Sequence, residues 1–346
     1  MNRVLRIAFF ALCTLAFLQP SFGQIAITVA FPPPAIPVYE LPPCPADGYL
    51  WTPGYWAWDP DYGYYWVPGT WVLAPEPGFL WTPGWWGWEN DAYIFNEGYW
   101  APEVGFYGGI NYGFGYFGVG FVGGRWDGGV FRYNTAVLNV NRTVIHNTYI
   151  DRTVIVNNGN HVSYNGGQGG IPARPTPEQE RVAQLRHIPP VAAQQQHIQA
   201  ARANPDLRAS QNKGKPPIAA TARPGDFRGQ GVVPAREAGA PYHAPPSHAA
   251  ELQQHQVTPA NTGNRQLDER YQKEQQDLVN RQNAEHQQLT QQQAREDQEA
   301  QQRNYSQQQR QQMEQRHQQQ TMRMEQRHTL EMHTMQMRQA APRPKR

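Results

Sequence analysis

Cysteine is nearly absent from this chain of 346 residues, which contains only Cys13 and Cys44. Cys13 lies inside an apolar run near the N-terminus, so removal of that run would leave Cys44 alone. A single cysteine excludes an internal disulfide and any paired-thiol metal or redox site. Two interpretations of Cys44 stay open, a bridge to another chain and a free thiol without an assigned role.

Long apolar segments are absent too. The longest run, Ile7–Leu18, is shorter than the roughly 20 residues that a membrane-spanning helix needs. Arg3 and Arg6 precede this run, and the small-x-small sequence Ser21-Phe22-Gly23 follows it. This order is typical of a secretory signal peptide, which we predict over 1–23. We therefore expect an exported protein that is periplasmic, associated with the outer membrane or extracellular, and at most peripheral to a membrane.

Recognisable catalytic motifs are missing as well. The sequence contains no His-Glu-x-x-His or Gly-x-Ser-x-Gly motif, and His146 and His161 are the only histidines within 48–170. Neither histidine lies in a nucleophile or zinc motif. We expect that the chain is not an enzyme and that it needs no cofactor.

The two halves of the chain differ in charge. Eleven acids against four arginines give residues 24–170 a net charge of −7. Seventeen acids against twenty-four lysines and arginines give residues 171–346 a net charge of +7. A basic half of this kind favours an acidic partner, which could be the chain's own N-terminal half, an anionic envelope polymer or a membrane face. Nucleic acid is not expected, because we predict export.

Composition divides the mature chain into successive segments. They are a Pro-rich extended lead-in over 24–47, a β-domain over 48–170 that holds every Trp, a disordered Pro/Gln/Ala-rich linker over 171–262 with at most one short helix within 177–202, a Gln-rich long helix over 263–340, and a basic tail over 341–346. The linker prediction rests on the scarcity of large apolar residues there. The helix prediction rests on the absence of Gly and Pro after Gly263 until Pro342.

One pattern, aromatic-x-aromatic-x-x-Gly-x-Trp, recurs in the β-domain. Its copies occupy 49–56, 64–71, 79–86 and 93–100, and a degenerate fifth copy occupies 119–126. Pro presets φ in a tight turn and Gly accepts a positive φ, so each copy predicts a strand, a turn and a returning strand. The predicted turn glycines are Gly54, Gly69, Gly84, Gly98 and Gly124. An isolated hairpin is marginally stable, so we expect these antiparallel hairpins to stack side by side.

Alternation along such hairpins predicts a ladder of aromatic rings on one face. Its members are Tyr49, Trp51, Trp56, Trp58, Trp66, Trp71, Trp81, Trp86, Trp88, Phe95, Trp100 and Trp126. The rings could form the core of a domain that has few Leu, Ile or Met residues, or a flat platform that stacks on sugar rings. We favour the core and keep binding of polysaccharide or peptidoglycan as an alternative.

These repeats resemble the W-x-x-G-x-W repeat family, also called Y-x-W-G-x-W repeats, of exported bacterial proteins. The resemblance covers about 48–170, including a Gly-rich segment over 105–124 and Asn165-Gly166-Gly167. It implies a location in the envelope or outside the cell, with no defined activity and no catalytic residues. The fourth and fifth copies depart from the pattern because they lack proline.

The predicted C-terminal helix has an 11-residue period. Leu267, Leu278, Leu289 and Ala300 follow this spacing, and three methionines at 313, 324 and 335 continue it after a phase slip. Eleven residues correspond to 3.67 residues per turn and give a nearly straight seam. Because the seam is narrow and weakly apolar, we expect a solvated helix or loose coiled coil that self-associates weakly.

The end of this helix also carries a candidate metal site. Met324, His328, Met332 and Met335 share one helical face. Thioether and imidazole ligands suit Cu(I), so copper binding is a second alternative function. The favoured hypothesis is a non-enzymatic structural or interaction protein of the envelope, whose partners could be envelope proteins or polysaccharide.

Overall fold

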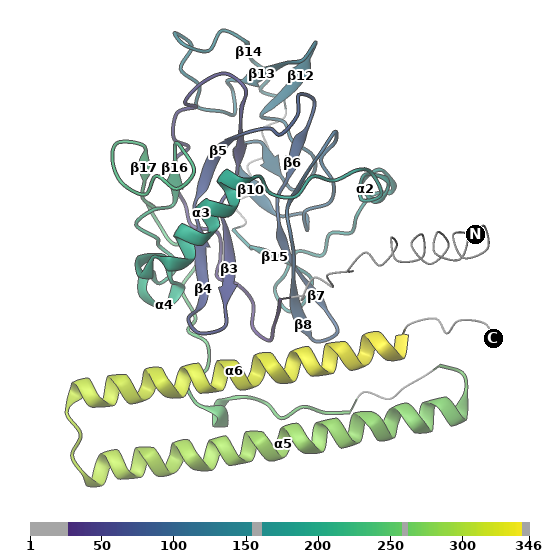
Figure 1. Ribbon diagram of the computed structural model, residues 1–346, viewed down its shortest axis with the longest axis vertical. Coiled ribbons are helices and arrows are strands. Elements are labelled where there is room, and N and C mark those ends of the chain that lie inside the picture. The colour runs from purple at the N-terminus through teal and green to yellow at the C-terminus, as the bar shows by residue number, and fades with distance from the viewer. Residues whose placement is uncertain (1–26, 154–160, 258–261, 341–346) are drawn as a thin grey trace, which may run out of the picture.

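The computed structural model describes residues 27–153, 161–257 and 262–340. A β-rich body stands on a pair of long helices, which cross one end of it (Figure 1). The predicted signal peptide over 1–23 and basic tail over 341–346 lie outside the described residues. Within the described part, no helix has both the length and the hydropathy of a membrane span.

The first two motif copies form one long β-hairpin. Its strands are β2 (Tyr49–Thr52), β3 (Tyr55–Asp59), β4 (Gly63–Val67) and β5 (Gly69–Leu73). β3 pairs with β4 and β2 pairs with β5 in one continuous antiparallel register, with Trp56 opposite Trp66 and Trp51 opposite Trp71. The chain therefore reverses between Asp59 and Gly63, and each motif copy is one arm of the hairpin.

Copies three and four repeat this arrangement. The second hairpin consists of β6 (Leu80–Thr82), β7 (Trp85–Glu89), β8 (Ala92–Asn96) and β9 (Tyr99–Ala101). β7 pairs with β8 and β6 with β9, again in one register. Asn90 and Asp91 form the reversal with φ of 50° and 60°, as a two-residue type I′ hairpin turn requires. Antiparallel hairpins are thus confirmed, but the prediction of a complete hairpin within each copy is wrong, because two copies form each hairpin.

The predicted role of the motif glycines as turn residues is wrong. Gly54, Gly69, Gly84 and Gly98 are not among the glycines with positive φ, and neither is Gly124 at the start of a later strand. Pro53-Gly54 lies opposite Pro68-Gly69, where the hairpin passes from one sheet to the next. L-Pro-Gly favours a type II turn, whose twist suits a two-residue hairpin poorly, so the reversals lie at the acidic links instead.

Shorter strands and the lead-in surround the two hairpins. They are β1 (Thr28–Val29), β10 (Asn111–Gly113), β11 (Tyr116–Phe117), β12 (Gly124–Asp127), β13 (Val130–Asn134), β14 (Thr148–Tyr149) and β15 (Tyr164–Asn165). β1 extends the second hairpin along β8, and β15 extends it along β7. The fifth motif copy ends in β12, which pairs with β13 and places Trp126 opposite Phe131.

The predicted disorder of the linker is not confirmed. Residues 171–257 form α2 (Pro177–Val182), α3 (Ala192–Ala203), α4 (Ala209–Asn212), β16 (Ala220–Thr221), β17 (Val232–Val233) and the 3-10 helix η3 (Ala249–Glu251). β16 pairs in parallel with β5 of the first hairpin. Small side chains such as Ala201, Ala219 and Ala220 are fully buried there. Composition alone underestimated the order of this segment, because its small side chains are buried against the large aromatic rings of the hairpins.

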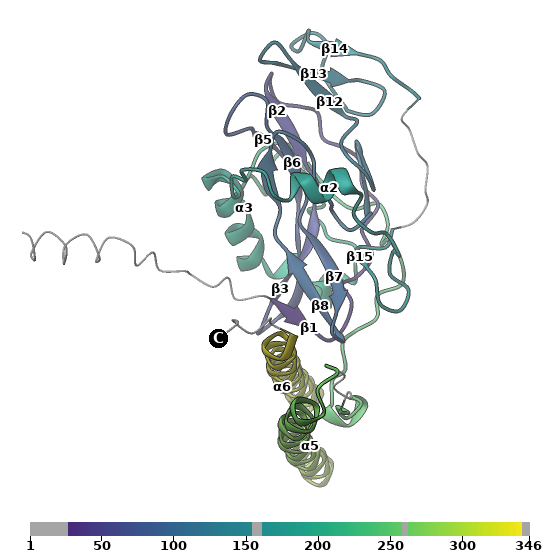
Figure 2. The ribbon, with the colours of Figure 1, turned by 90° about the vertical axis from the view of Figure 1, so that its right-hand side faces the viewer.

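The C-terminal stretch is helical as predicted, but it forms two helices instead of one. α5 (Arg265–Gln302) and α6 (Gln307–Ala340) lie side by side in both views and join at a turn where Asn304 has a φ of 50° (Figures 1 and 2). The residues that pair across them run in reverse order, so the helices are antiparallel. The phase slip in the 11-residue period falls at this turn.

Candidate functional site

The aromatic ladder lies mostly inside the β-rich body. Trp51, Trp56, Trp58, Trp66, Trp71, Trp81, Trp86 and Trp100 are buried, whereas Tyr49, Trp88, Phe95 and Trp126 are half-buried. The two hairpins pack against each other through these rings. Tyr64 of one hairpin meets Trp86 of the other edge-on at 5.4 Å, and Tyr55 stacks on Phe95 at 5.4 Å. The ladder therefore forms the core.

Within each hairpin, the second aromatic of a motif copy, three residues before its glycine, covers the glycine of the opposite arm. The ring of Trp51 lies where a Cβ on Gly69 would be, and the ring of Trp66 occupies the same place above Gly54. Trp81 covers Gly98 and Phe95 covers Gly84 in the second hairpin. The W-x-x-G spacing thus specifies a reciprocal contact of ring and bare backbone between two copies.

The indole N–H groups connect distant segments to this core. Trp56 and Trp71 donate to the backbone oxygens of Ala35 and Pro42 in the lead-in, at 3.0 Å each. Trp66 donates to the Ala219 oxygen at 2.9 Å, and Trp100 donates to Gln194 at 2.8 Å. Because buried indole donors are favoured by partners, these bonds help to hold residues 27–47 and 171–257 on the hairpins.

Ion pairs also join the acidic and basic parts of the chain. Arginines after residue 170 pair with acids before it, as Arg181–Glu103, Arg186–Glu76, Arg202–Asp59, Arg236–Glu40 and Arg323–Asp61. The carboxylate of Asp59 is 5% exposed, so its pair with Arg202 at 2.6 Å is the most shielded. Of the three acidic partners that the sequence suggested, the structure shows the chain's own N-terminal half in contact with the basic half.

Cys44 is a free, buried thiol. It donates to the Ala46 oxygen at 3.2 Å, and burial raises its pKa to about 12. The thiolate is the nucleophilic form of cysteine, so a thiol held in this state is unreactive near neutral pH. The bridge to another chain therefore loses support, and the free thiol is the interpretation that fits.

The helix pair carries a histidine–carboxylate arrangement that occurs twice. His317 and His328 lie 11 residues apart on α6, and Glu296 and Glu285 lie 11 residues apart on α5. His317 Nε2 is 3.0 Å from Glu296 Oε2, and His328 Nε2 is 2.9 Å from Glu285 Oε2. A carboxylate can only accept, so both Nε2 atoms carry a hydrogen, and in the neutral form of each ring Nδ1 has the lone pair.

A third segment, residues 243–257, lies along the two helices, and we call it the histidine arm. Side chains of α5 make hydrogen bonds to both the C=O and the N–H of Ala249 in η3. His286 Nε2 donates to its oxygen at 2.7 Å, and its N–H donates to Gln293 Oε1 at 2.9 Å. These bonds hold the neighbouring His248 over the helix pair, and Asn283 of α5 donates to the His255 backbone oxygen at 3.4 Å.

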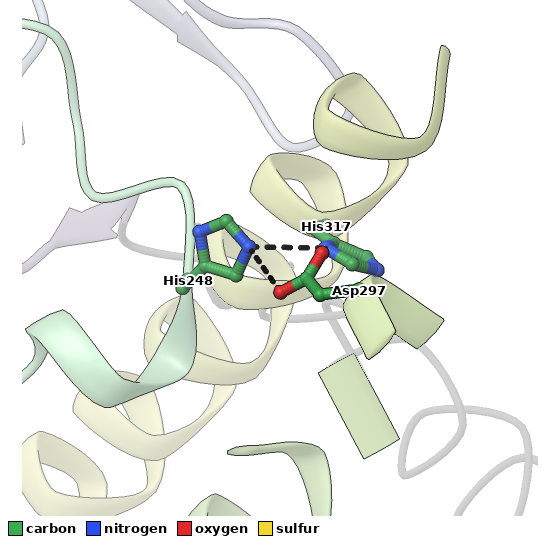
Figure 3. Close-up of side chains that lie close together, drawn as sticks. All are labelled: His248, Asp297 and His317. Atoms are coloured by element: carbon green, nitrogen blue, oxygen red, sulfur yellow. Dashed lines mark hydrogen bonds and ion pairs between the residues drawn. The ribbon is translucent and has the colours of Figure 1, made fainter. Parts of the chain in front are cut away.

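The first cluster joins the arm, α5 and α6, as Figure 3 shows. His248 Nε2 lies 3.2 Å from His317 Nδ1 and 3.3 Å from Asp297 Oδ2. Asp297 Oδ1 lies 3.8 Å from His317 Nδ1. On its other side His248 Nδ1 is 3.2 Å from the Ser247 hydroxyl. Two imidazoles and a carboxylate therefore converge on one point.

The second cluster consists of His255, Glu325 and His328. One ligand atom from each of these residues lies within 4.8 Å of the other two. His255 Nε2 is 3.6 Å from Glu325 Oε2 and makes no hydrogen bond, although it is buried. The rings of His255 and His328 meet at 71° with their centroids 5.8 Å apart, close to the 73° and 5.1 Å of His248 and His317.

Hydrogen bonds keep the two carboxylates that contact His317 and His328, those of Glu296 and Glu285, ionised. Burial opposes ionisation of Glu296, but hydrogen bonds from Gln292, His317 and Arg316 outweigh it and lower its pKa to about 2. The hydrogen bond from His328 is the main cause that lowers the pKa of Glu285. Burial lowers the pKa of His328 and so favours its neutral form, which is the form that binds metals.

The methionines of the predicted copper site lie near the clusters in sequence. Met324 and Met335 are buried, Met332 is half-buried, and His328 is almost fully buried. The side chain of His328 contacts the Glu285 carboxylate and the His255 ring. Sequence reasoning missed His248, His255, Asp297, Glu285, Glu296 and Glu325. The repeated Met-Glu-Gln-Arg-His at 313–317 and 324–328 was the available signal.

Comparison with known proteins agrees with the pairing of copies. A model of the WXXGXW repeat matches twice, at 47–72 and 77–101, and each match covers one long hairpin. No curated protein and no solved structure matches the chain. The chain therefore contains two WXXGXW repeats, at residues 47–72 and 77–101.

Proposed function

We propose that the chain is a non-enzymatic structural or interaction protein of the bacterial cell envelope. In this proposal the β-rich body is a rigid scaffold that carries the helix pair α5–α6. The observation that carries the proposal is the use of the ladder rings as a core, with their N–H groups holding the lead-in and the segment after residue 170. Rings engaged in this way stabilise a shape and leave little surface for stacking on a ligand.

The helix pair supplies the surface for partners. α6 touches the body, where Arg323 pairs with Asp61 and Met322 lies against Gly63, while α5 lies on the far side of α6 (Figure 2). Exposed side chains of α5 include Gln291, Gln298 and Arg295. A long polar surface on a rigid support suits binding to other envelope components.

Export and the buried state of the rings can be tested on the full chain. A C-terminal alkaline phosphatase fusion reports export, and we expect activity that is lost when residues 1–23 are deleted. Tryptophan emission should be blue-shifted and resist quenching by acrylamide, because the ladder rings are shielded from water. A cytoplasmic fusion, or emission like that of free tryptophan, would contradict the proposal.

Glycan binding is a second candidate, at a groove that shares only Phe95 with the ladder. A groove of about 810 Å³ is lined by the aromatic rings of Trp85, Phe106, Tyr99 and His187, together with Asn96 and Gln179. Trp85 and Phe106 meet edge-on at 5.0 Å, and Tyr99 stacks on His187 at 3.8 Å. Aromatic walls with a few polar groups are typical of sugar sites.

Titration with peptidoglycan fragments and soluble polysaccharides separates the two candidates. The scaffold proposal expects no change in tryptophan emission. A change that disappears in Trp85→Ala but persists in the matched control Trp126→Ala would instead establish the groove as a glycan site. Trp126 is half-buried like Trp85 and lies outside the groove.

A further inference from the structure

The spacing within the first histidine cluster matches that of metal ligands. A tetrahedral zinc site with bonds of about 2.0–2.1 Å places neighbouring ligand atoms about 3.3 Å apart. His248 Nε2 lies 3.2 Å from His317 Nδ1 and 3.3 Å from Asp297 Oδ2, and the other Asp297 oxygen, Oδ1, lies 3.8 Å from His317 Nδ1. A cation at their centre could therefore reach all three with little movement of the side chains.

The surroundings orient these atoms as in known metal sites. A ligating histidine usually donates its second ring N–H to a carboxylate or another acceptor, which fixes the ring and the lone pair that faces the metal. His317 does so through Nε2 to Glu296 at 3.0 Å. On the other side of the cluster, His248 Nδ1 lies 3.2 Å from Ser247 Oγ and 3.5 Å from Glu251. The other nitrogens, His317 Nδ1 and His248 Nε2, face each other and Asp297, and an ion would replace the hydrogen bond that joins them.

The second cluster has a similar arrangement of histidines and carboxylates. His328 Nε2 contacts Glu285 at 2.9 Å, as His317 contacts Glu296. His255 Nε2 is buried and without a hydrogen bond, 3.6 Å from a Glu325 oxygen. A buried nitrogen that makes no hydrogen bond costs free energy unless a ligand meets it. This atom is an observation independent of the repeated geometry.

We propose that the helix pair and the histidine arm bind two divalent transition-metal ions of the zinc type. His248, Asp297 and His317 hold the first ion, and His255, Glu325 and His328 hold the second. Imidazole and carboxylate ligands suit Zn²⁺ and its neighbours in the series, whereas the predicted thioether site suits Cu(I). Each ion has three protein ligands, which leaves a fourth position for water.

Binding joins the arm to α5 and α6 at the first site and to α6 at the second. Each proposed site takes one ligand from the arm and the others from the helix pair, with α5 supplying Asp297 to the first site. Because an unfolded chain holds no such preformed sites, the ions stabilise the folded arrangement. Zinc therefore fastens the arm to the helices and protects the arm from protease.

Calorimetry of the full chain with zinc chloride, after removal of metal by a chelator, tests the proposal. We expect two equivalents for the wild type, one each for Asp297→Asn and Glu325→Gln, and none for the double variant. These substitutions keep the size of the side chains and spare the fully buried His317. His333→Ala, on the same helix outside both clusters, is the control and should bind two.

A second readout follows the arm directly. Zinc should raise the melting temperature and slow proteolysis within 243–257 in the wild type and the control, but not in the double variant. Equal zinc binding by the wild type and the double variant would overturn the proposal and leave the clusters as hydrogen-bonded packing only. Loss in Asp297→Asn alone would retain the first site and reject the second.

Discussion

The β-rich body and the helix pair bury different kinds of side chain. The body is filled by indole and phenol rings, and several of them, such as Trp66 and Tyr116, donate their single polar hydrogen to a backbone oxygen. The interface of the helix pair contains buried amides, imidazoles and hydroxyls, among them Gln293, His317 and Thr321. One region is specified by the shape of large rings over bare backbone, and the other by hydrogen-bond partners.

This difference has a consequence for stability. A buried aromatic removes on the order of 150–250 Å² from water, which is the main favourable contribution to folding. A buried amide contributes little beyond replacing its bonds to water, and it costs free energy when a partner is missing. We therefore expect the helix pair to open locally at lower free energy than the body. The following changes test that contrast.

Removal of one core ring should have the largest effect. Trp66→Ala deletes a fully buried indole that covers Gly54 and holds the Ala219 oxygen. We expect the free energy of unfolding of the body to fall by about 3–5 kcal/mol in a urea titration followed by tryptophan emission. Trp88→Ala, a half-buried ring of the second hairpin, is the control and should lose less. Equal losses would mean that the buried ladder is not the core.

Acid should weaken the attachment of α3 to the first hairpin. Burial lowers the pKa of His197 to about 4 from an ordinary 6.5, and its ring atoms bond the Pro68 oxygen and the Gly225 N–H. The unfolded chain takes up a proton below pH 6.5 that the folded chain excludes, so this stabilisation is present above 6.5.

The stabilisation from neutral His197 is lost as the pH falls from 6.5 to 4, by on the order of 3 kcal/mol. Urea midpoints measured across this range should fall with acid. The His197→Leu variant should be less stable at pH 7, and its midpoint should lose this part of the pH dependence. An unchanged slope in the variant would show that other groups cause it.

A single amide should matter in the helix pair although no apolar area is lost. Gln293 bonds the Ala249 N–H, the His317 oxygen and the Thr321 hydroxyl, and so joins α5, α6 and the arm. Gln293→Leu leaves these groups without that partner and should cost about 1–3 kcal/mol. Hydrogen exchange in α5 and α6 should quicken while exchange in β3 and β4 does not change. The exposed Gln291→Leu is the matched control.

The smallest effect should come from the ion pair between the two regions. Arg323 on α6 pairs with Asp61 in the turn of the first hairpin, and both side chains are at least half exposed. Exposed pairs contribute about 0–1 kcal/mol and are screened by salt. Arg323→Ala should therefore change the melting temperature little, and that change should vanish in high salt. A large loss would show that the pair anchors the helices to the body.

The local features of the body could be predicted from its sequence because they are periodic. Alternating aromatics predicted the strands, and the scarcity of Leu and Ile predicted that rings such as Trp51 and Trp66 form the core. The partner of each strand could not be predicted in the same way. Pro53-Gly54 resembles a turn by composition, and only the facing Pro68-Gly69, fifteen residues later, shows that it is a crossing point between sheets.

Contacts between distant segments account for the other differences. The segment after residue 170 has few large apolar groups, but Ala219 and Gln194 receive indole N–H groups from the hairpins. The histidine clusters depend on an arm that folds back over helices which begin after it. The period of α6 alone placed His328 beside methionines, whereas His255 and Glu285 approach it from other segments.

The pairing of copies limits how such a domain can grow. Because a Trp in one copy covers the glycine of the next, a solitary copy would leave a ring without bare backbone and a glycine without a cover. Gene duplication within the domain should therefore add copies two at a time, in steps of about thirty residues. A single inserted copy would have to pair with a strand that is not a motif copy. The degenerate fifth copy does this, because its last strand, β12, pairs with β13.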